Sequence, residues 1–448
     1  MEIDSRIPSA SGEPALRRHI GLLALTLYGI GDILGAGIYG LVGKAAGLMG
    51  NAIWLAFLAS MIAAGLTGLS YAAVGSRFPR AGGAAYVTQR AFKKSWLAYV
   101  VGLAALASGL TSMATASRVF SGYLQAMLPS IPMWVLIIGV ASLMAGIVFR
   151  GIRETIWANS LCTIIELSGL LIIIIFGISA IGSVDYLDAA VPSNPEGLIT
   201  PGLVLGGAVL TFYSFIGFED ILNVSEEVKD PARTIPRGLI FAVLGASAVY
   251  ILISLIAVSI VPAAELADSK QPLVEVVKVA IPWFPPQLFS LIALFAVSNT
   301  ALLNYVMGSR LLYGMSKQRL LPSFLSKVHK KTATPHVAVG ILYVILLTLA
   351  LSGDISSLAK STSVLLLLCF ILVNIALIVL KRREPTPQGA FDVPAIVPIL
   401  GTLTCIAMLL HAEAPELTTA GIILAVIAVL YFVKRPSAEA IEKIDAID

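Results

Sequence analysis

Twelve long apolar runs, separated by short polar segments, follow one another along most of the chain. A helix that crosses a bilayer needs about 20 predominantly apolar residues, and the runs have about that length. A membrane β-barrel would instead show segments of roughly ten residues in which polarity alternates. The pattern therefore predicts an all-α polytopic membrane protein with twelve transmembrane helices. The expected spans are residues 20–47, 52–76, 96–125, 131–149, 155–182, 199–224, 238–262, 284–314, 335–352, 357–380, 393–411 and 415–433.

The composition agrees with this fold class and excludes several others. Of 448 residues, 58% are hydrophobic and only 12% are charged. In an ordinary soluble chain roughly a quarter of the residues are charged. The segments between the runs are too short for a separate soluble domain, so we expect any functional site to lie inside the helical bundle. Disorder, a collagen-like chain and an ordinary soluble enzyme are excluded.

The distribution of basic residues predicts how the chain is oriented. Lysine and arginine collect in the cytoplasmic loops of membrane proteins. Here 25 of the 30 lie in the two tails or in the even-numbered loops, on one side of the predicted bundle. Both termini are therefore expected in the cytoplasm, and the protein in the cell membrane. The net charge of +4 reflects this asymmetry and does not indicate a nucleic-acid partner.

Side chains that carry enzymatic or metal chemistry are few and scattered. Cys162, Cys369 and Cys405 lie far apart in apolar runs, and the four histidines occupy tails, loops or segment ends without a paired-ligand spacing. No Ser-His-Asp set can be placed at one depth. We expect no enzyme, no catalytic residue, no cofactor and no metal site. A channel is also disfavoured, because the sequence shows no ring of pore-lining charges and no repeated filter loop.

Glycines interrupt two of the twelve spans. The first span contains GIGDILGAGIYGLVG, and in the sixth, TFYSFIGFEDILN, Gly217 is followed closely by Glu219 and Asp220. Glycine destabilises helix interiors, and a carboxylate in hydrocarbon costs roughly 2.5–3.5 kcal/mol on insertion scales. The pattern predicts two discontinuous helices. The alternative is that the glycines only allow close helix packing.

A broken helix offers polar backbone groups in the middle of the membrane. The N–H groups that open the second half-helix can hold a carboxylate, and carbonyl groups of the first half can hold a cation or an amine. The two breaks are 180 residues apart, and each opens a block of five helices, which predicts an inverted repeat. The expected parts are an N-terminal tail (1–19), a first repeat (20–182), a second repeat (199–380), two further helices (393–433) and a C-terminal tail (434–448).

At these residues the chain resembles the amino acid–polyamine–organocation (APC) superfamily. The resemblance covers nearly the whole length and is carried by four motifs. They are GIGDILGAGIYGLVG, PRAGGAAY, FIGFEDILNVSEEVKDPARTIPRG and NTALLNYVMGSRLLYGM. It implies a five-plus-five inverted repeat with two extra helices, and uptake or exchange of amino acids or amines. By position, the substrate-binding residues it implies are Gly35, Ala36, Gly37 and Ile38 at the first break, and Tyr213, Ser214, Phe215, Ile216 and Gly217 at the second.

Several acids inside the spans are candidates for ion coupling. Some proton-coupled members of the superfamily carry a lysine where this chain has Glu166, so the lysine-based scheme does not apply here. We expect Asp32 and Glu166 to face each other and to share a proton or, as a second choice, to hold a sodium ion. The residues expected at the coupling and gating sites are Asp32, Glu166, Glu219, Asp220, Ser298, Asn299 and Thr300. The alternative is that these acids only cap or join helices.

The function that these features favour is secondary active transport of amino acids by alternating access, with proton-coupled symport as the preferred mode. The substrate is a small amino acid or amine, and the surrounding partner is the lipid bilayer. Two alternatives stay open: a polyamine or cationic amino acid exchanger, and a membrane sensor that binds amino acids without transporting them. The substrate, the driving ion, uptake or exchange, and the oligomeric state do not follow from the sequence.

Overall fold

The chain folds into a bundle of helices of very different lengths. A computed structural model describes residues 20–79, 83–150, 153–317, 321–329, 332 and 334–434, and within these residues there is no β-strand. The α-helices are α1 (Leu22–Ile33), α2 (Ala36–Met49), α3 (Ile53–Arg77), α4 (Gly83–Phe92), α5 (Ser95–Met127), α6 (Met133–Arg150), α7 (Arg153–Gly177), α8 (Pro201–Phe212), α9 (Pro231–Ile260), α10 (Ala263–Asp268), α11 (Pro272–Ala280), α12 (Pro286–Lys317), α13 (His336–Ser352), α14 (Ile355–Arg383), α15 (Ile396–Leu410) and α16 (Ala414–Lys434). Short 3-10 helices are η1 (Gly50–Ala52), η2 (Ile178–Ala180), η3 (Tyr213–Phe215), η4 (Phe218–Glu227) and η5 (Ser323–Ser326).

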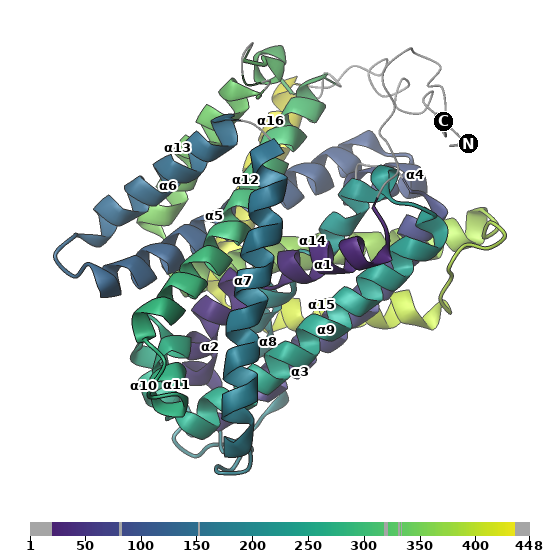
Figure 1. Ribbon diagram of the computed structural model, residues 1–448. Coiled ribbons are helices and arrows are strands. Elements are labelled where there is room, and N and C mark those ends of the chain that lie inside the picture. Colours follow the sequence, from purple (N-terminus) through teal and green to yellow (C-terminus); the bar gives the residue numbers. More distant parts are fainter. Residues whose placement is uncertain are drawn as a thin grey trace, which may run out of the picture.

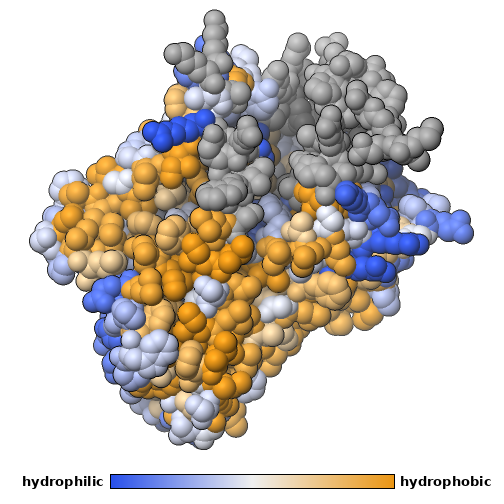
Figure 2. Space-filling view, viewed as in Figure 1, coloured by the Kyte–Doolittle hydropathy of each residue, from blue (hydrophilic) through white to orange (hydrophobic). Residues whose placement is uncertain are grey.

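Many of these helices are long and apolar enough to cross a membrane. The described part of the chain contains nine candidate spans, and two shorter apolar helices, α13 and α15, accompany them. The first candidate, Leu22–Arg77, is folded as three α-helices in succession, α1, α2 and α3. Apolar side chains dominate the visible lateral surface (Figure 2). The chain is therefore a multi-pass membrane protein, as predicted.

The long helices pack around a central group. Helix α5 packs against α12 and α14, and α3 packs against α8 and α9. Helices α1 and α2 lie inside this arrangement, whereas α6 and α13 run side by side at one edge (Figure 1). Local signals fix several helix starts. Pro201 opens α8, and the hydroxyl of Thr200 accepts a hydrogen bond from the Leu203 N–H at 3.1 Å.

Three helices lie in segments that were expected to be loops. Helix α4 follows α3, and α10 and α11 connect α9 to α12. Helix α4 lies at one end of the bundle and α10 with α11 at the opposite end (Figure 1). Each is too short to cross a bilayer, which is why a search for runs of about 20 apolar residues does not find them. Their positions decide which end of the bundle is open.

Candidate functional site

The first predicted break is present between α1 and α2. Helix α1 ends at Ile33 and α2 begins at Ala36. Gly35 between them has a φ of +125°, a conformation that side chains rarely adopt. A Cβ atom at Gly35 would also lie 2.2 Å from the hydroxyl oxygen of Thr300 on α12. Only glycine fits this position, so the break is fixed by both the backbone and the neighbouring helix.

The start of α2 presents N–H groups at this break. The first N–H groups of a helix have no partner within the helix. The Ala36 N–H donates to the hydroxyl oxygen of Thr300 at 3.2 Å, so one of the three expected carboxylate donors is already engaged. Gly37 lies against the second break, because a Cβ atom there would be 2.5 Å from the Cα of Ser214. The two breaks are therefore in direct contact.

The second predicted break lies after α8. Helix α8 ends at Phe212, η3 follows, and Gly217 has a φ of +124° before η4 begins. The Gly217 N–H donates to Oε2 of Glu219 at 2.9 Å. A Cβ atom at Gly217 would lie 2.6 Å from the carbonyl oxygen of Asp32. After this break the chain forms the 3-10 helix η4 and not the expected second α-helical half. The segment contains short polar side chains such as Asp220 and Ser225, which disfavour an α-helix because they compete for local backbone hydrogen bonds.

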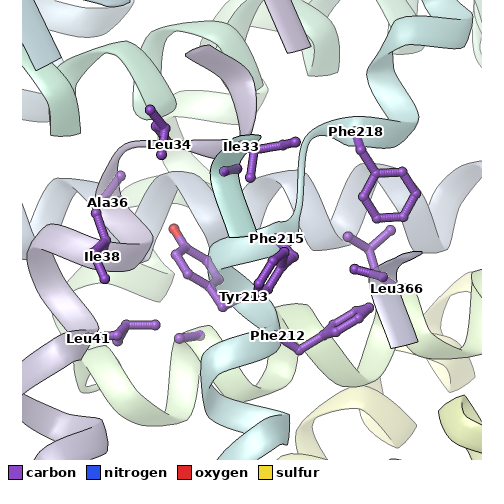
Figure 3. Close-up of a cluster of buried hydrophobic side chains, with 14 of the residues drawn as sticks. Ile33, Leu34, Ala36, Ile38, Leu41, Phe212, Tyr213, Phe215, Phe218 and Leu366 are labelled. Carbon is purple, nitrogen blue, oxygen red and sulfur yellow. The ribbon is translucent and has the colours of Figure 1, made fainter. Parts of the chain in front are cut away.

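Tyr250 on α9 joins the two breaks. Its buried hydroxyl lies 2.6 Å from the carbonyl oxygen of Ile33 and 2.7 Å from that of Ser214, one from each break. Its ring packs edge-on against Phe215 with the centroids 5.2 Å apart. Figure 3 shows Ile33, Leu34 and Ala36 of the first break close to the residues of the second. Sequence reasoning missed Tyr250; its only signal is a polar tip inside an apolar span.

A cavity of about 500 Å³ extends from the two breaks. Its walls include Gly37 and Ile216 at the breaks, and it reaches Tyr86 and Gln89 on α4. It thus opens toward the end of the bundle that is predicted to be cytoplasmic. At the opposite end, α10 and α11 pack over α2, and the Gln271 side-chain amide donates to the Tyr123 carbonyl oxygen at 2.8 Å. The cavity lining does not include residues of α10 or α11.

The candidate acids form two groups and not the expected pair. Asp32, Glu219 and Asp220 line the cavity together, and a Cβ atom at Gly217 would lie 3.1 Å from the carboxyl carbon of Asp32. Glu166 lies apart: its Oε1 would be 3.5 Å from a Cβ atom at Gly35. Neither oxygen of Glu166 has a hydrogen-bond partner among the residues that the structure describes. Asp32 and Glu166 therefore do not share a hydrogen bond, because Asp32 turns toward the second break.

Glu166 on α7 is enclosed beside α12 and the first break. It is 0% exposed, and its backbone carbonyl accepts a hydrogen bond from the Tyr39 hydroxyl at 3.0 Å. Of the three predicted α12 neighbours, Thr300 reaches the break. Ser298 instead donates to the Phe295 carbonyl oxygen of its own helix. Asn299 is buried, and its amide has no partner in the described part of the chain.

The site contains oxygen acceptors but no cluster typical of a resident metal. Among the described residues, no group of three or more His, Cys, Asp or Glu side chains is placed to hold a metal ion. What the geometry offers is a cavity at the two helix breaks, a group of acids that lines it and one fully enclosed carboxyl group. This arrangement can bind a small zwitterionic molecule and a proton or cation.

Comparison with known proteins agrees with this geometry. The model of the amino acid permease family matches residues 20–433. The chain is 27% identical to the branched-chain amino acid permease BcaP of Bacillus subtilis over 91% of each chain. It is 27% identical to the methylthioribose transporter of the same organism over 89% of each chain. It is 29% identical to cationic amino acid transporter 4 of Mus musculus, over 86% of this chain and 63% of the mouse protein.

The match runs through both helix breaks and all the helices that line the cavity. The chain belongs to the amino acid permease family.

Proposed function

We propose that the protein is a secondary transporter that moves amino acids across the cell membrane by alternating access, with a proton as the coupling ion. The observation that carries this proposal is the cavity that begins where the two broken helices meet. Broken helices at the midplane supply the polar groups that a zwitterion needs inside hydrocarbon. Two relatives are named for amino acid transport, which supports the same substrate class.

The proposed architecture has twelve crossings in a five-plus-five inverted repeat followed by two helices. It is supported by nine candidate spans in the described part of the chain, the first of which is 56 residues long, and by the two shorter apolar helices. The matched positions of the two breaks, in residues 20–182 and 199–380, support the repeat. The basic residues support cytoplasmic termini.

The substrate would lie between the two breaks. Its carboxylate would accept hydrogen bonds at the start of α2, where Gly37 and Ile38 follow the engaged Ala36. Its amine would donate to carbonyl groups between Tyr213 and Gly217. A polyamine has no carboxylate and would leave the α2 donors unused, so the proposal favours amino acids.

Glu166 is the proposed proton carrier. A carboxylate enclosed in an apolar pocket without partners carries a large desolvation cost, and protonation removes that cost. Its neighbour Gly35 belongs to the hinge between α1 and α2, so a charge on Glu166 would act directly on the hinge. The acids of the cavity wall, Asp32 and Asp220, would then act on the inner opening. A sodium ion at Glu166 and Thr300 is the second choice.

Counterflow of a labelled amino acid into proteoliposomes tests transport. Vesicles loaded with unlabelled substrate should transiently accumulate the labelled substrate, and the process should saturate. Binding of amino acids in a thermal-shift assay without any counterflow would instead assign the protein as a sensor.

A further inference from the structure

Three polar side chains form a hydrogen-bonded row along the cavity wall. They are Ser112 on α5, Tyr213 on η3 and Asn304 on α12. The hydroxyl groups of Ser112 and Tyr213 lie 3.2 Å apart. The side-chain amide nitrogen of Asn304 donates to the Ser112 hydroxyl at 3.4 Å and to the Thr300 carbonyl oxygen at 2.9 Å. The row connects the second break to the middle of α12.

This row fixes the orientation of the Asn304 amide. A backbone carbonyl can only accept, so the amide group that faces Thr300 must be the NH₂ end. The oxygen Oδ1 then points the other way, and a Cβ atom at Gly109 would lie 3.2 Å from it. No residue in the described ranges donates a hydrogen bond to Oδ1. Asn304 therefore presents a positioned, unused acceptor in the cavity wall.

The wall around Asn304 leaves room for a substrate side chain. Gly109 and Ser108 on α5 and Gly308 on α12 line the same part of the cavity, and none of them carries a large side chain. The cavity continues from the breaks to this wall without interruption. An amino acid held by its carboxylate and amine at the breaks would extend its side chain toward α5 and α12.

The charges in the cavity also select among side chains. Asp32, Glu219 and Asp220 line it, together with one basic residue, Arg310. An acidic side chain would meet more carboxyl groups than cations. A side chain with an N–H donor would find acceptors among the same lining residues, at these carboxyl groups and at Asn304.

We propose that Asn304 determines specificity: Oδ1 accepts a hydrogen bond from the substrate side chain, so the transporter prefers amino acids whose side chains carry an N–H donor, amide or basic. A site built around a hydrogen bond rejects analogues without the donor, because its own buried polar group is then left unpaired. Apolar branched-chain and acidic substrates would bind less well. This inference rests on the proposed function.

Competition in the counterflow assay tests it. Glutamine and leucine are similar in size but only glutamine has the donor, so unlabelled glutamine should compete roughly tenfold better than leucine in the wild type, as expected for one hydrogen bond. Asn304→Leu should remove this ratio, whereas Tyr305→Phe, on the same helix but outside the cavity lining, should leave it unchanged. The wild-type ranking can be checked without any variant by thermal shift with both amino acids.

The possible failures are distinguishable. Equal competition by glutamine and leucine in the wild type, or an unchanged ratio in Asn304→Leu, would overturn the role of Asn304 and leave transport intact. Absence of any amino acid binding or flux in the wild type would overturn the proposed function, and the inference with it.

Discussion

Gly37 shows how much of the site depends on the absence of a side chain. It lies inside α2, where glycine is normally unfavourable, and its hydrogen points at the backbone of Ser214. A methyl group there would be 2.5 Å from the Ser214 Cα, and backbone cannot move aside as cheaply as a side-chain end. The residue is therefore a requirement of the contact between the breaks.

Gly37→Ala should reduce substrate affinity by roughly tenfold or more, because forcing the breaks apart costs about 1–3 kcal/mol. Equilibrium binding of the labelled substrate measures this. Gly65→Ala on α3 is the control, since a Cβ atom at Gly65 would meet nothing within 4 Å. Wild-type affinity in Gly37→Ala would show that the breaks need not touch.

Tyr250→Phe should weaken both stability and substrate binding. The hydroxyl has one proton, so the change removes the buried donor shared by the Ile33 and Ser214 carbonyl groups and leaves one of them unpaired, at a cost of about 1–3 kcal/mol. Tyr305→Phe is the matched control: its buried hydroxyl donates to the Val339 carbonyl oxygen at 2.7 Å, away from the breaks. The temperature of thermal unfolding should fall in both variants. Substrate affinity should fall in Tyr250→Phe alone. Equal affinities would limit Tyr250 to a packing role.

At the scale of elements, α4 lines the open end of the cavity and is tied to the end of α14. Arg90 pairs with Glu384 at 3.3 Å and lies over the ring of Phe78 at 4.6 Å. Partial burial works against the charge of Arg90, but the hydrogen bond and attraction of Glu384 raise the pKa of Arg90 above its usual value. The Arg383 guanidinium donates to the Ala91 carbonyl oxygen at 2.7 Å. These contacts hold α4 in place beside the opening.

Glu384→Gln should loosen α4 and expose the cavity. Cys369 is a native thiol in the cavity lining, so its modification by a small maleimide should become faster. The increase should be a few-fold, because the Arg90–Glu384 ion pair is partly exposed and contributes at most about 1 kcal/mol. Mass spectrometry of the labelled protein gives the rate at this residue. Glu275→Gln, which breaks the Lys278 pair on α11, should not change it. Equal rates in all three proteins would mean that the Arg90 pair does not hold α4 in place.

The breaks could be predicted from the sequence, whereas their partners could not. Clustered glycines and an acid pair in apolar runs are local signals, and they placed the breaks at Gly35 and Gly217 correctly. Tyr250 and Asn304 act across long sequence distances, and a lone polar residue in an apolar span has no pattern that reveals its partner. The register of α1 against η4 was equally hidden, so the sequence did not reveal that Asp32 lies against Gly217 and that Glu166 has no hydrogen-bond partner among the described residues.

At the scale of the whole molecule, the two ends of the bundle differ. The cavity opens between the breaks and α4, while α10 and α11 close the opposite end over α2. Alternating access, as proposed, requires the open end to close and the closed end to open. Gly35, in the break between α1 and α2, lies between the two ends. Glu166 is enclosed beside Gly35, and this position is the reason for our proposal that its protonation is coupled to the exchange.

The most direct test is accumulation of substrate in proteoliposomes under an imposed pH gradient, acidic outside, in the wild type and in Glu166→Gln. The wild type should concentrate the amino acid, and a protonophore should abolish this. Glu166→Gln should still perform counterflow but should lose accumulation, while the control Glu275→Gln behaves as the wild type. Proton-driven accumulation that is unchanged in Glu166→Gln would contradict the account, and accumulation driven only by a sodium gradient would replace the proton with sodium.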